Sequence, residues 1–176
     1  KINSQFGFPV VIKPINEGSS VGVFICNKNN ILNYLKKLNF YDEIMVEQYI
    51  PGREIQSAIM GNNKLGAIEL IPKRKFYDYK AKYNKNAKTK HIMPAELSKK
   101  DYIKVNDIAL KAHRLLKCRG ISRSDFRYYK NKFYLLELNT QPGMTSLSLV
   151  PEIAKHKKIS FFKLLDWIIK DASINR

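Results

Sequence analysis

Four polar residues in the second half of the chain have the types and spacing of a metal-binding site. Glu137 and Asn139 alternate with apolar residues in the run LLELN, and Arg123 and Asp125 alternate in the run SRSDF. If these runs form a hairpin around residues 130–132, Asp125 faces Glu137 and Arg123 faces Asn139. All four then lie on one side of a sheet, because strand side chains alternate with a period of two.

Two carboxylates that face each other across a strand pair destabilise a sheet. Their Cβ atoms lie only about 5 Å apart, so a cation is needed between them. Two carboxylates and an amide are oxygen ligands that suit Mg²⁺ or Mn²⁺, and magnesium often brings nucleotide phosphates as further ligands. The alternative is that Arg123 and Arg127 neutralise the acids in a surface ladder. The spacing leaves both interpretations open.

Two earlier stretches fit a nucleotide site. In KPINEGSSVG, a Gly/Ser loop follows Lys13; its backbone N–H groups suit phosphates, and the lysine adds positive charge. In IMVEQYIPGRE, Glu47 ends a strand and Glu54 follows a turn, so a strand edge and an acid are available to read an adenine amino group. Ordinary turns explain both stretches equally well.

Several elements must position these residues. Strands are predicted at 8–12 and 21–25, followed by a helix with Ile31, Leu32, Leu35 and Leu38 on one stripe, and then a strand at 44–48. Strands at 54–60 and 64–70 enclose the turn residues 61–63, which suit a hairpin. The polar, Lys/Tyr-rich run 72–95 lacks clear periodicity and predicts a mobile flap.

The second half is predicted to contain two helices and a strand pair. Ser98 can cap a long helix whose stripe faces the core, and Gly120 stands where that helix would stop; the stripe comprises Ile103, Ile108, Ala112 and Leu115. Strands at 121–129 and 132–138 then close the sheet, and an amphipathic helix over 160–172 follows.

Composition limits the class of protein. With 176 residues and 44% hydrophobic content, the chain can build a globular core, and it lacks the run of about 18 apolar residues that a membrane span needs. The formal charge of +17 raises the question of nucleic acid. The lysines are scattered rather than clustered, so we expect a solvated basic surface instead.

The cysteines and the first residues suggest where the protein is located and whether it belongs to a longer chain. Cys26 and Cys118 are far apart and lack neighbouring ligands, so neither a zinc site nor a disulfide framework is indicated and a cytoplasmic location is expected. The sequence starts at Lys1 without an initiator Met or signal peptide, and we expect it to be the middle of a longer chain.

Taken together, these motifs resemble the D-alanine:D-alanine ligase family of the ATP-grasp superfamily. The resemblance runs from about residue 8 to about residue 155, through KPINEGSSVGV, VEQYIPGRE, FYDYKAKY, SRSDF and LLELNTQPGMTSLSLVP. It implies a mixed α+β or α/β ATP-grasp fold with an antiparallel sheet flanked by helices. Residues 1–50 would form part of the central subdomain, and residues 51–176 the C-terminal catalytic subdomain with the flap 72–95.

The resemblance also implies roles for individual residues. The ATP-binding residues would be Lys13, Glu17, Ser19, Ser20, Glu47, Gln48, Tyr49, Ile50, Glu54 and Lys82. Asp125, Glu137 and Asn139 would bind two Mg²⁺ or Mn²⁺ ions. Arg123 and the backbone N–H of Gly143 would stabilise a tetrahedral intermediate, Tyr83 would hydrogen-bond toward Ser19 as the flap closes, and Ser148 with Leu149 would hold the carboxylate of a second D-alanine.

The implied activity is ATP-dependent ligation of two D-alanines through an acylphosphate, for peptidoglycan precursor synthesis. The flap run YDYKAKY resembles that of dipeptide-forming members. Family members also have an N-terminal domain that binds the first D-alanine, and this chain lacks a counterpart to it. We therefore expect an active parent enzyme but little or no activity from this piece alone, with a homodimer partner or a missing N-terminal half as possible partners.

Two other functions stay open at this level. One is an ATP-grasp ligase that acts on a different carboxylate and amine. The other is a non-catalytic basic module that binds nucleic acid, whose affinity would fall steeply with salt and would not respond to Glu137→Gln.

Overall fold

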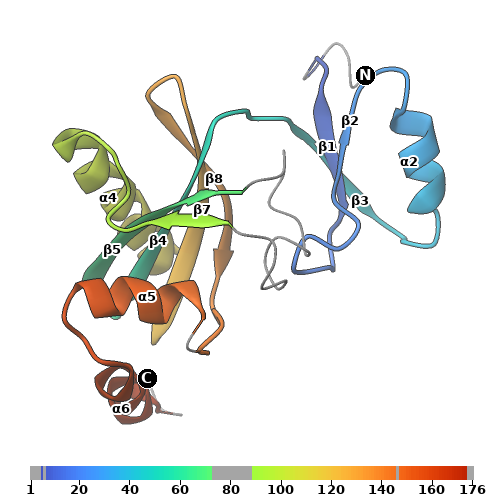
Figure 1. The fold of residues 1–176 in the computed structure, drawn as a ribbon. Coiled ribbons are helices and arrows are strands. Elements are labelled where there is room, and N and C mark those ends of the chain that lie inside the picture. Colours follow the sequence, from blue (N-terminus) through green and yellow to red (C-terminus); the bar gives the residue numbers. More distant parts are fainter. Residues whose placement is uncertain (1–4, 6, 73–88, 146, 174–176) are drawn as a thin grey trace. The chain divides into compact units, whose positions relative to one another are not determined.

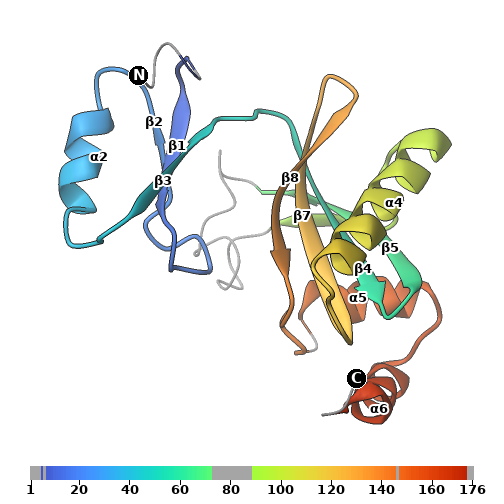
Figure 2. The same ribbon diagram turned by 180° about the vertical axis from the view of Figure 1, so that it is seen from behind.

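The computed structural model of the chain describes residue 5 and residues 7–72, 89–145 and 147–173. The chain divides into two compact units, one with Lys1–Ile50 and Pro72–Thr89 and the other with Pro51–Ile71 and Lys90–Arg176. Each unit has its own antiparallel sheet and hydrophobic core, and Figures 1 and 2 draw them from opposite sides. None of the helices in the described ranges is long and apolar enough to cross a membrane.

The first unit is a three-stranded sheet with one helix beside it. Its strands are β1 (Val10–Pro14), β2 (Phe24–Cys26) and β3 (Ile44–Gln48) in the order β2-β1-β3, and its helix is α2 (Ile31–Lys37). Every second residue of β1 is buried, and these residues pack with Ile31 and Leu38. The alternation is the pattern expected for a strand with one face on a core.

Two details of the first unit differ from the sequence prediction. The strand expected at 21–25 is only β2, because Gly22 has a φ of 69°, which a strand does not accommodate. Leu32, expected on the buried stripe of α2, is 69% exposed. The stripe that contacts the sheet is narrower than the apolar pattern suggested.

The second unit contains a five-stranded antiparallel sheet in the order β6-β5-β4-β7-β8. Its strands are β4 (Arg53–Met60), β5 (Asn63–Ile71), β6 (Lys90–Ile92), β7 (Ile121–Tyr129) and β8 (Lys132–Asn139), and its helices are α4 (Lys99–Leu115), α5 (Leu149–His156) and α6 (Phe161–Asp171). Figures 1 and 2 show α4 against one side of this sheet and α5 on the other.

Helix α4 begins as predicted but buries only part of the predicted stripe. The Ser98 hydroxyl accepts a hydrogen bond from the Asp101 backbone N–H at 3.1 Å, as expected of a cap. Ile108 of the predicted stripe packs against the core. However, Ile103 and Leu115 are 51% and 71% exposed, and the buried residues are Val105, Asn106, Ala109 and His113. The helix ends at Leu115, before Gly120, and Lys117 takes the left-handed conformation at its end.

Two serines of the sheet are buried on the α4 side with hydrogen-bond partners on the helix. The Ser57 hydroxyl of β4 donates to Asn106 Oδ1 at 3.0 Å, and His113 Nδ1 lies 2.7 Å from the Ser122 hydroxyl of β7. The apolar pattern of the helix therefore misses the buried Asn106 and His113. The choice depends on which polar groups the sheet offers.

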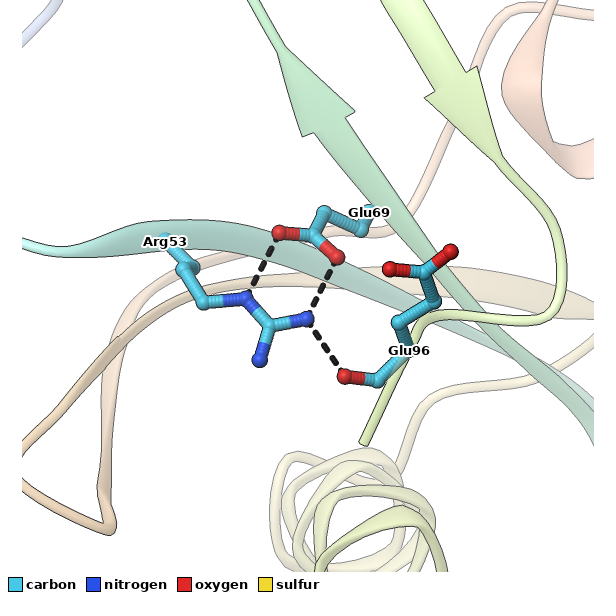
Figure 3. A network of polar contacts seen from close by, with 3 residues as sticks. All are labelled: Arg53, Glu69 and Glu96. Carbon is cyan, nitrogen blue, oxygen red and sulfur yellow. Dashed lines mark hydrogen bonds and ion pairs between the residues drawn. The ribbon is translucent and has the colours of Figure 1, made fainter. Parts of the chain in front are cut away.

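A partly buried ion pair holds the segment that leads into α4. Arg53 donates to both carboxylate oxygens of Glu69, at 2.6 and 2.5 Å, and to the backbone carbonyl of Glu96 at 2.6 Å. Figure 3 shows the guanidinium bridging the two strands and this segment. Glu69 is 4% exposed, so Arg53 is its compensating charge.

The predicted flap 72–95 is only partly a loop. Its last residues form β6, which pairs with the edge of β5, and Ala95 is buried in the core. The predicted loop is thus wrong for residues 90–92, which pair with β5 as a strand. Residues 73–88, including Lys82 and Tyr83, lie outside the described residues.

Candidate functional site

The strand pair β7–β8 brings the four polar residues together as the sequence predicted. Asp125 is the register partner of Glu137, and Arg123 is that of Asn139. The neighbouring residues Ser124 and Phe126 are fully buried, and Phe126 belongs to the core cluster with α4. Asp125 and Glu137 therefore lie on the opposite face, the side of the sheet away from α4.

A β-bulge sets this register. The strands are joined by a two-residue turn in which Lys130 and Asn131 have φ values of 48° and 58°, as in a type I′ hairpin. The pairing that starts from this turn shifts by one residue between Phe126 and Asp125, so Leu136 has no register partner. The turn predicted around residues 130–132 is therefore one residue shorter, and the bulge restores the predicted opposition.

Arg123 supplies the positive charge that the acid pair needs. Its Nε and Nη2 atoms donate to the two carboxylate oxygens of Asp125 at 2.7 and 3.0 Å. Asp125 is 6% exposed, so the pair is largely shielded from water. Arg123 thus neutralises Asp125 as the alternative interpretation predicted. Arg127, the other arginine of that interpretation, forms an ion pair with Glu54 at 3.5 Å. A guanidinium and a bound cation would compete for the same carboxylate.

The oxygen ligands fit a hard divalent cation. Two facing carboxylates lie beside the Asn139 amide on one face, and Asp125 already attracts a cationic group. Asn139 Oδ1 accepts a hydrogen bond from the Gln141 backbone N–H at 2.9 Å, which fixes its orientation. Among the described residues, no group of three His, Cys, Asp or Glu side chains is placed to hold a metal. The candidate set instead depends on the amide as its third ligand.

The loop after β8 leads directly into α5. The Ser148 hydroxyl accepts from the Thr145 backbone N–H at 3.0 Å and lies 2.9 Å from the Thr145 hydroxyl. A Cβ built on Gly143 would come within 2.9 Å of the Ser148 hydroxyl. The close approach explains a glycine here, and Ser148 stands at the N-cap of α5, next to the buried Leu149.

In the first unit, the lysine and glutamate predicted for nucleotide binding contact each other. Lys13 Nζ on β1 lies 2.7 Å from Glu47 Oε2 on β3, with the side chains 23% and 33% exposed. The residues predicted to follow Glu47 continue along the end of β3, where Tyr49 donates its backbone N–H to the Pro9 carbonyl at 3.3 Å. Gln48 ends the strand, and Ile50 ends the first of the two segments of this unit. Glu54 belongs to the second unit.

The Gly/Ser loop has an unusual backbone conformation. Ser19 and Ser20 have consecutive left-handed conformations, which non-glycine residues seldom adopt and which cluster at functional loops. Glu17 accepts a hydrogen bond from the Tyr41 hydroxyl at 2.9 Å. That bond raises the pKa of Tyr41, because it favours the protonated phenol.

Sequence reasoning missed two polar residues near these groups. Tyr41 follows α2 in an irregular segment, and its type and spacing give no sign of a contact with Glu17. Gln56 stands in the buried strand run IQSAIM and is 1% exposed. A glutamine within this largely apolar strand run was a usable signal, because a buried amide needs hydrogen-bond partners.

Comparison with known proteins agrees with these motifs. A family model described as "D-ala D-ala ligase C-terminus" matches residues 1–170. A D-alanine–D-alanine ligase of Pelagibacter ubique is 65% identical over 99% of this chain and 58% of its own length. The corresponding ligase of Paramagnetospirillum magneticum is 45% identical over 93% of this chain and 55% of its length. The chain thus spans less than two thirds of these relatives.

Solved structures give the same result for the fold. A D-alanine–D-alanine ligase from Bacillus anthracis complexed with ATP superposes with a TM-score of 0.80 at 31% identity, over 96% of this chain and 53% of that one. The VanG D-Ala:D-Ser ligase from Enterococcus faecalis gives 0.83 at 30% identity, over 96% and 51%. The fold is therefore that of the C-terminal region of ATP-grasp ligases, as the sequence predicted. The chain belongs to the family of D-alanine–D-alanine ligase C-terminal regions.

Proposed function

We propose that this chain provides the nucleotide- and metal-binding part of a cytoplasmic D-alanine–D-alanine ligase that makes the dipeptide for peptidoglycan precursors. The observation that carries this proposal is the opposition of Asp125 and Glu137 on one face, with Arg123 and Asn139 beside them. The identity of 65% to a ligase of that name supports it. Under this proposal, residues 1–50 belong to the central ATP-grasp subdomain and residues 51–176 to the catalytic subdomain with the flap.

Divalent cations would be held by Asp125, Glu137 and Asn139. When bound, Mg²⁺ or Mn²⁺ ions would neutralise negative charge on the phosphates of ATP. Lys13 would bind the α- and β-phosphates, and its ammonium group would then leave the carboxylate of Glu47 for the phosphate oxygens. Glu47, with the backbone of Gln48, Tyr49 and Ile50, would hold the adenine.

The remaining assigned residues would complete the nucleotide site. Glu54 would bind the ribose and Lys82 the γ-phosphate. The loop residues Glu17, Ser19 and Ser20 would cover the phosphates, and Tyr83 would close over them toward Ser19.

The proposed chemistry has two steps. The carboxylate of the first D-alanine attacks the γ-phosphorus of ATP, so that an acylphosphate forms and ADP leaves. The amine nitrogen of the second D-alanine then attacks the acyl carbon, the C–O bond to phosphate breaks, and the dipeptide and inorganic phosphate leave after loss of a proton from nitrogen. Arg123 and the Gly143 N–H would stabilise the tetrahedral oxyanion between attack and expulsion.

The second D-alanine would be oriented by the start of α5. Ser148 and Leu149 would bind its carboxylate, and the N-terminus of the helix favours a negative charge at that position. The hydroxyl of Ser148 now interacts with Thr145, and this contact would be exchanged for the substrate.

Calorimetric titration of the chain with ADP and Mg²⁺ tests the proposal. We expect magnesium-dependent binding that Glu137→Gln abolishes, while Glu152→Gln, which removes an acid of α5, leaves it unchanged. Binding without Mg²⁺ dependence, or none at all by a folded sample, would contradict the assignment. Because the chain spans 58% of its relative's length, we also expect little or no D-alanine-dependent phosphate release from it alone.

A further inference from the structure

Gln56 is a buried polar residue that faces the proposed metal ligands. On β4 it is the register partner of Asp125, which in turn faces Glu137 on β8. The adjacent residues Ile55 and Ser57 point to the other side, where they meet the core and Asn106 of α4. Gln56, Asp125 and Glu137 thus form a row across three neighbouring strands, on the face away from α4.

An ion pair supports this placement of the β4 side chains. Glu54, two residues before Gln56, pairs with Arg127, two residues after Asp125, at 3.5 Å. Strand residues two apart share a face, so the side chains of Gln56 and Asp125 lie on this face as well. Across antiparallel strands, directly opposed residues have Cβ atoms about 5 Å apart.

The amide of Gln56 lacks one expected interaction. Gln56 is 1% exposed, and its Oε1 atom has no hydrogen-bond partner among the described residues. Buried acceptors are almost always paired with a donor, and an apolar residue of similar size would fill this position in a buried strand without that defect. The oxygen is therefore positioned for a donor that arrives with a ligand.

The chemistry of Oε1 limits what that donor can be. A carbonyl oxygen only accepts hydrogen bonds, so phosphate oxygens and the carboxylates of Asp125 and Glu137 are excluded. Water in the shell of a divalent cation is a strong donor, and magnesium usually retains several waters. The side chain lies beside one of the two proposed carboxylate ligands, where such a water would be within reach.

We propose that Gln56 is a positioning residue of the metal site, whose Oε1 accepts a hydrogen bond from a water molecule coordinated to a cation at Asp125 and Glu137. This inference rests on the proposed function and adds an outer-sphere partner from β4 to it. Such partners orient the coordination shell, and their loss commonly weakens metal affinity by about tenfold or more.

The test is a titration of the chain with Mn²⁺ alone, with the free ion followed by its electron paramagnetic resonance signal. Gln56→Met keeps the length of the side chain but removes the acceptor, and we expect its Mn²⁺ dissociation constant to rise by about tenfold. Without metal, the same variant should unfold at a higher temperature than the wild type, because the unpaired oxygen is gone. A purely structural role for the amide predicts the opposite shift.

Ser124→Ala is the matched control. Its hydroxyl is the other buried side-chain oxygen without a partner among the described residues, but Ser124 faces the α4 side and should not affect Mn²⁺. Gln56→Glu adds a third carboxylate to the row and keeps an oxygen acceptor, so it should bind Mn²⁺ at least as tightly as the wild type. This variant tests the role of Gln56 if Gln56→Met fails to fold.

The outcomes separate the two proposals. Wild-type binding that Asp125→Asn abolishes, with Gln56→Met equal to Ser124→Ala, would overturn the role of Gln56 and leave the metal site intact. Weaker binding by Gln56→Glu than by the wild type would also overturn it. Absence of Mn²⁺ binding by the folded wild-type chain would overturn both this inference and the metal site.

Discussion

Glu137 lies directly opposite Asp125, although a regular hairpin built from the Lys130-Asn131 turn would place Leu136 there. The bulge at Leu136 returns Glu137 to the face of Asp125. Without that bulge, the second carboxylate would point to the side of the sheet that packs on α4. One extra residue in β8 therefore determines whether the two acids can act together.

Arg123 should stabilise the acid pair when no metal is bound. Arg123→Ala leaves the nearly buried Asp125 facing Glu137 without its bidentate partner, and we expect the free energy of unfolding in EDTA to fall by about 3 kcal/mol. Excess Mg²⁺ should restore part of this loss and should stabilise the variant more than the wild type. Urea unfolding with and without Mg²⁺ measures both effects.

Arg119→Ala is a suitable control for that experiment, because Arg119 lies at the surface and donates to a backbone carbonyl near the end of the chain. Its effect should stay below about 0.5 kcal/mol. Equal stabilisation of the wild type and Arg123→Ala by Mg²⁺ would show that guanidinium and metal do not compete.

Gly22 should be essential to the Gly/Ser loop, whereas Gly18 should not. Gly22 has a φ of 69°, and a Cβ there would lie 2.9 Å from two ring atoms of Pro14, so Gly22→Ala should cost at least about 1–2 kcal/mol. Nothing lies within 4 Å of a Cβ at Gly18, and Gly18→Ala should be nearly neutral. Thermal unfolding compares the two, and similar losses of stability would refute the distinction.

Acid should destabilise the chain through His113. Burial, with a smaller effect of Arg114, lowers the pKa of His113 from the ordinary 6.5. The folded state thus holds the neutral ring while the unfolded state takes up a proton, so this stability is complete above pH 6.5 and is lost as the pH falls below it toward the lowered pKa. His113→Gln should reduce the loss between about pH 7.5 and about pH 5.5 in urea unfolding.

His156→Gln provides the comparison, because His156, the last residue of α5, is exposed. It should keep the pH dependence of the wild type. If both variants retain that dependence in full, another group is responsible for it.

Arg53 should contribute far more to stability than a surface ion pair does. Arg53→Met leaves Glu69 buried without its partner, and we expect a loss of about 3 kcal/mol. Lys64→Met, which breaks the exposed pair with Asp107, should cost less than about 1 kcal/mol. The double variant Arg53→Met/Glu69→Met should recover much of the loss, since no charge then remains buried; an additive result in denaturant unfolding would count against this explanation.

The sequence alone determined the types and alternation of the site residues. The runs SRSDF and LLELN place Arg123, Asp125, Glu137 and Asn139 two residues apart within their strands, and a period of two is a local property of the chain. The order of the motifs was sufficient for the resemblance to ATP-grasp ligases. The hairpins and the Ser98 cap were also readable, because each depends on a few adjacent residues.

The tertiary structure decided which groups meet across long separations. The apolar pattern of α4 predicted that Ile103 and Leu115 would be buried. Asn106 and His113 are buried instead, because serines on β4 and β7 form hydrogen bonds with them. Tyr41 reaches Glu17 through the packing of the first unit, and Gln56 meets Asp125 through the strand order β4-β7-β8. Such contacts follow from strand order and register, which short-range periodicity does not encode.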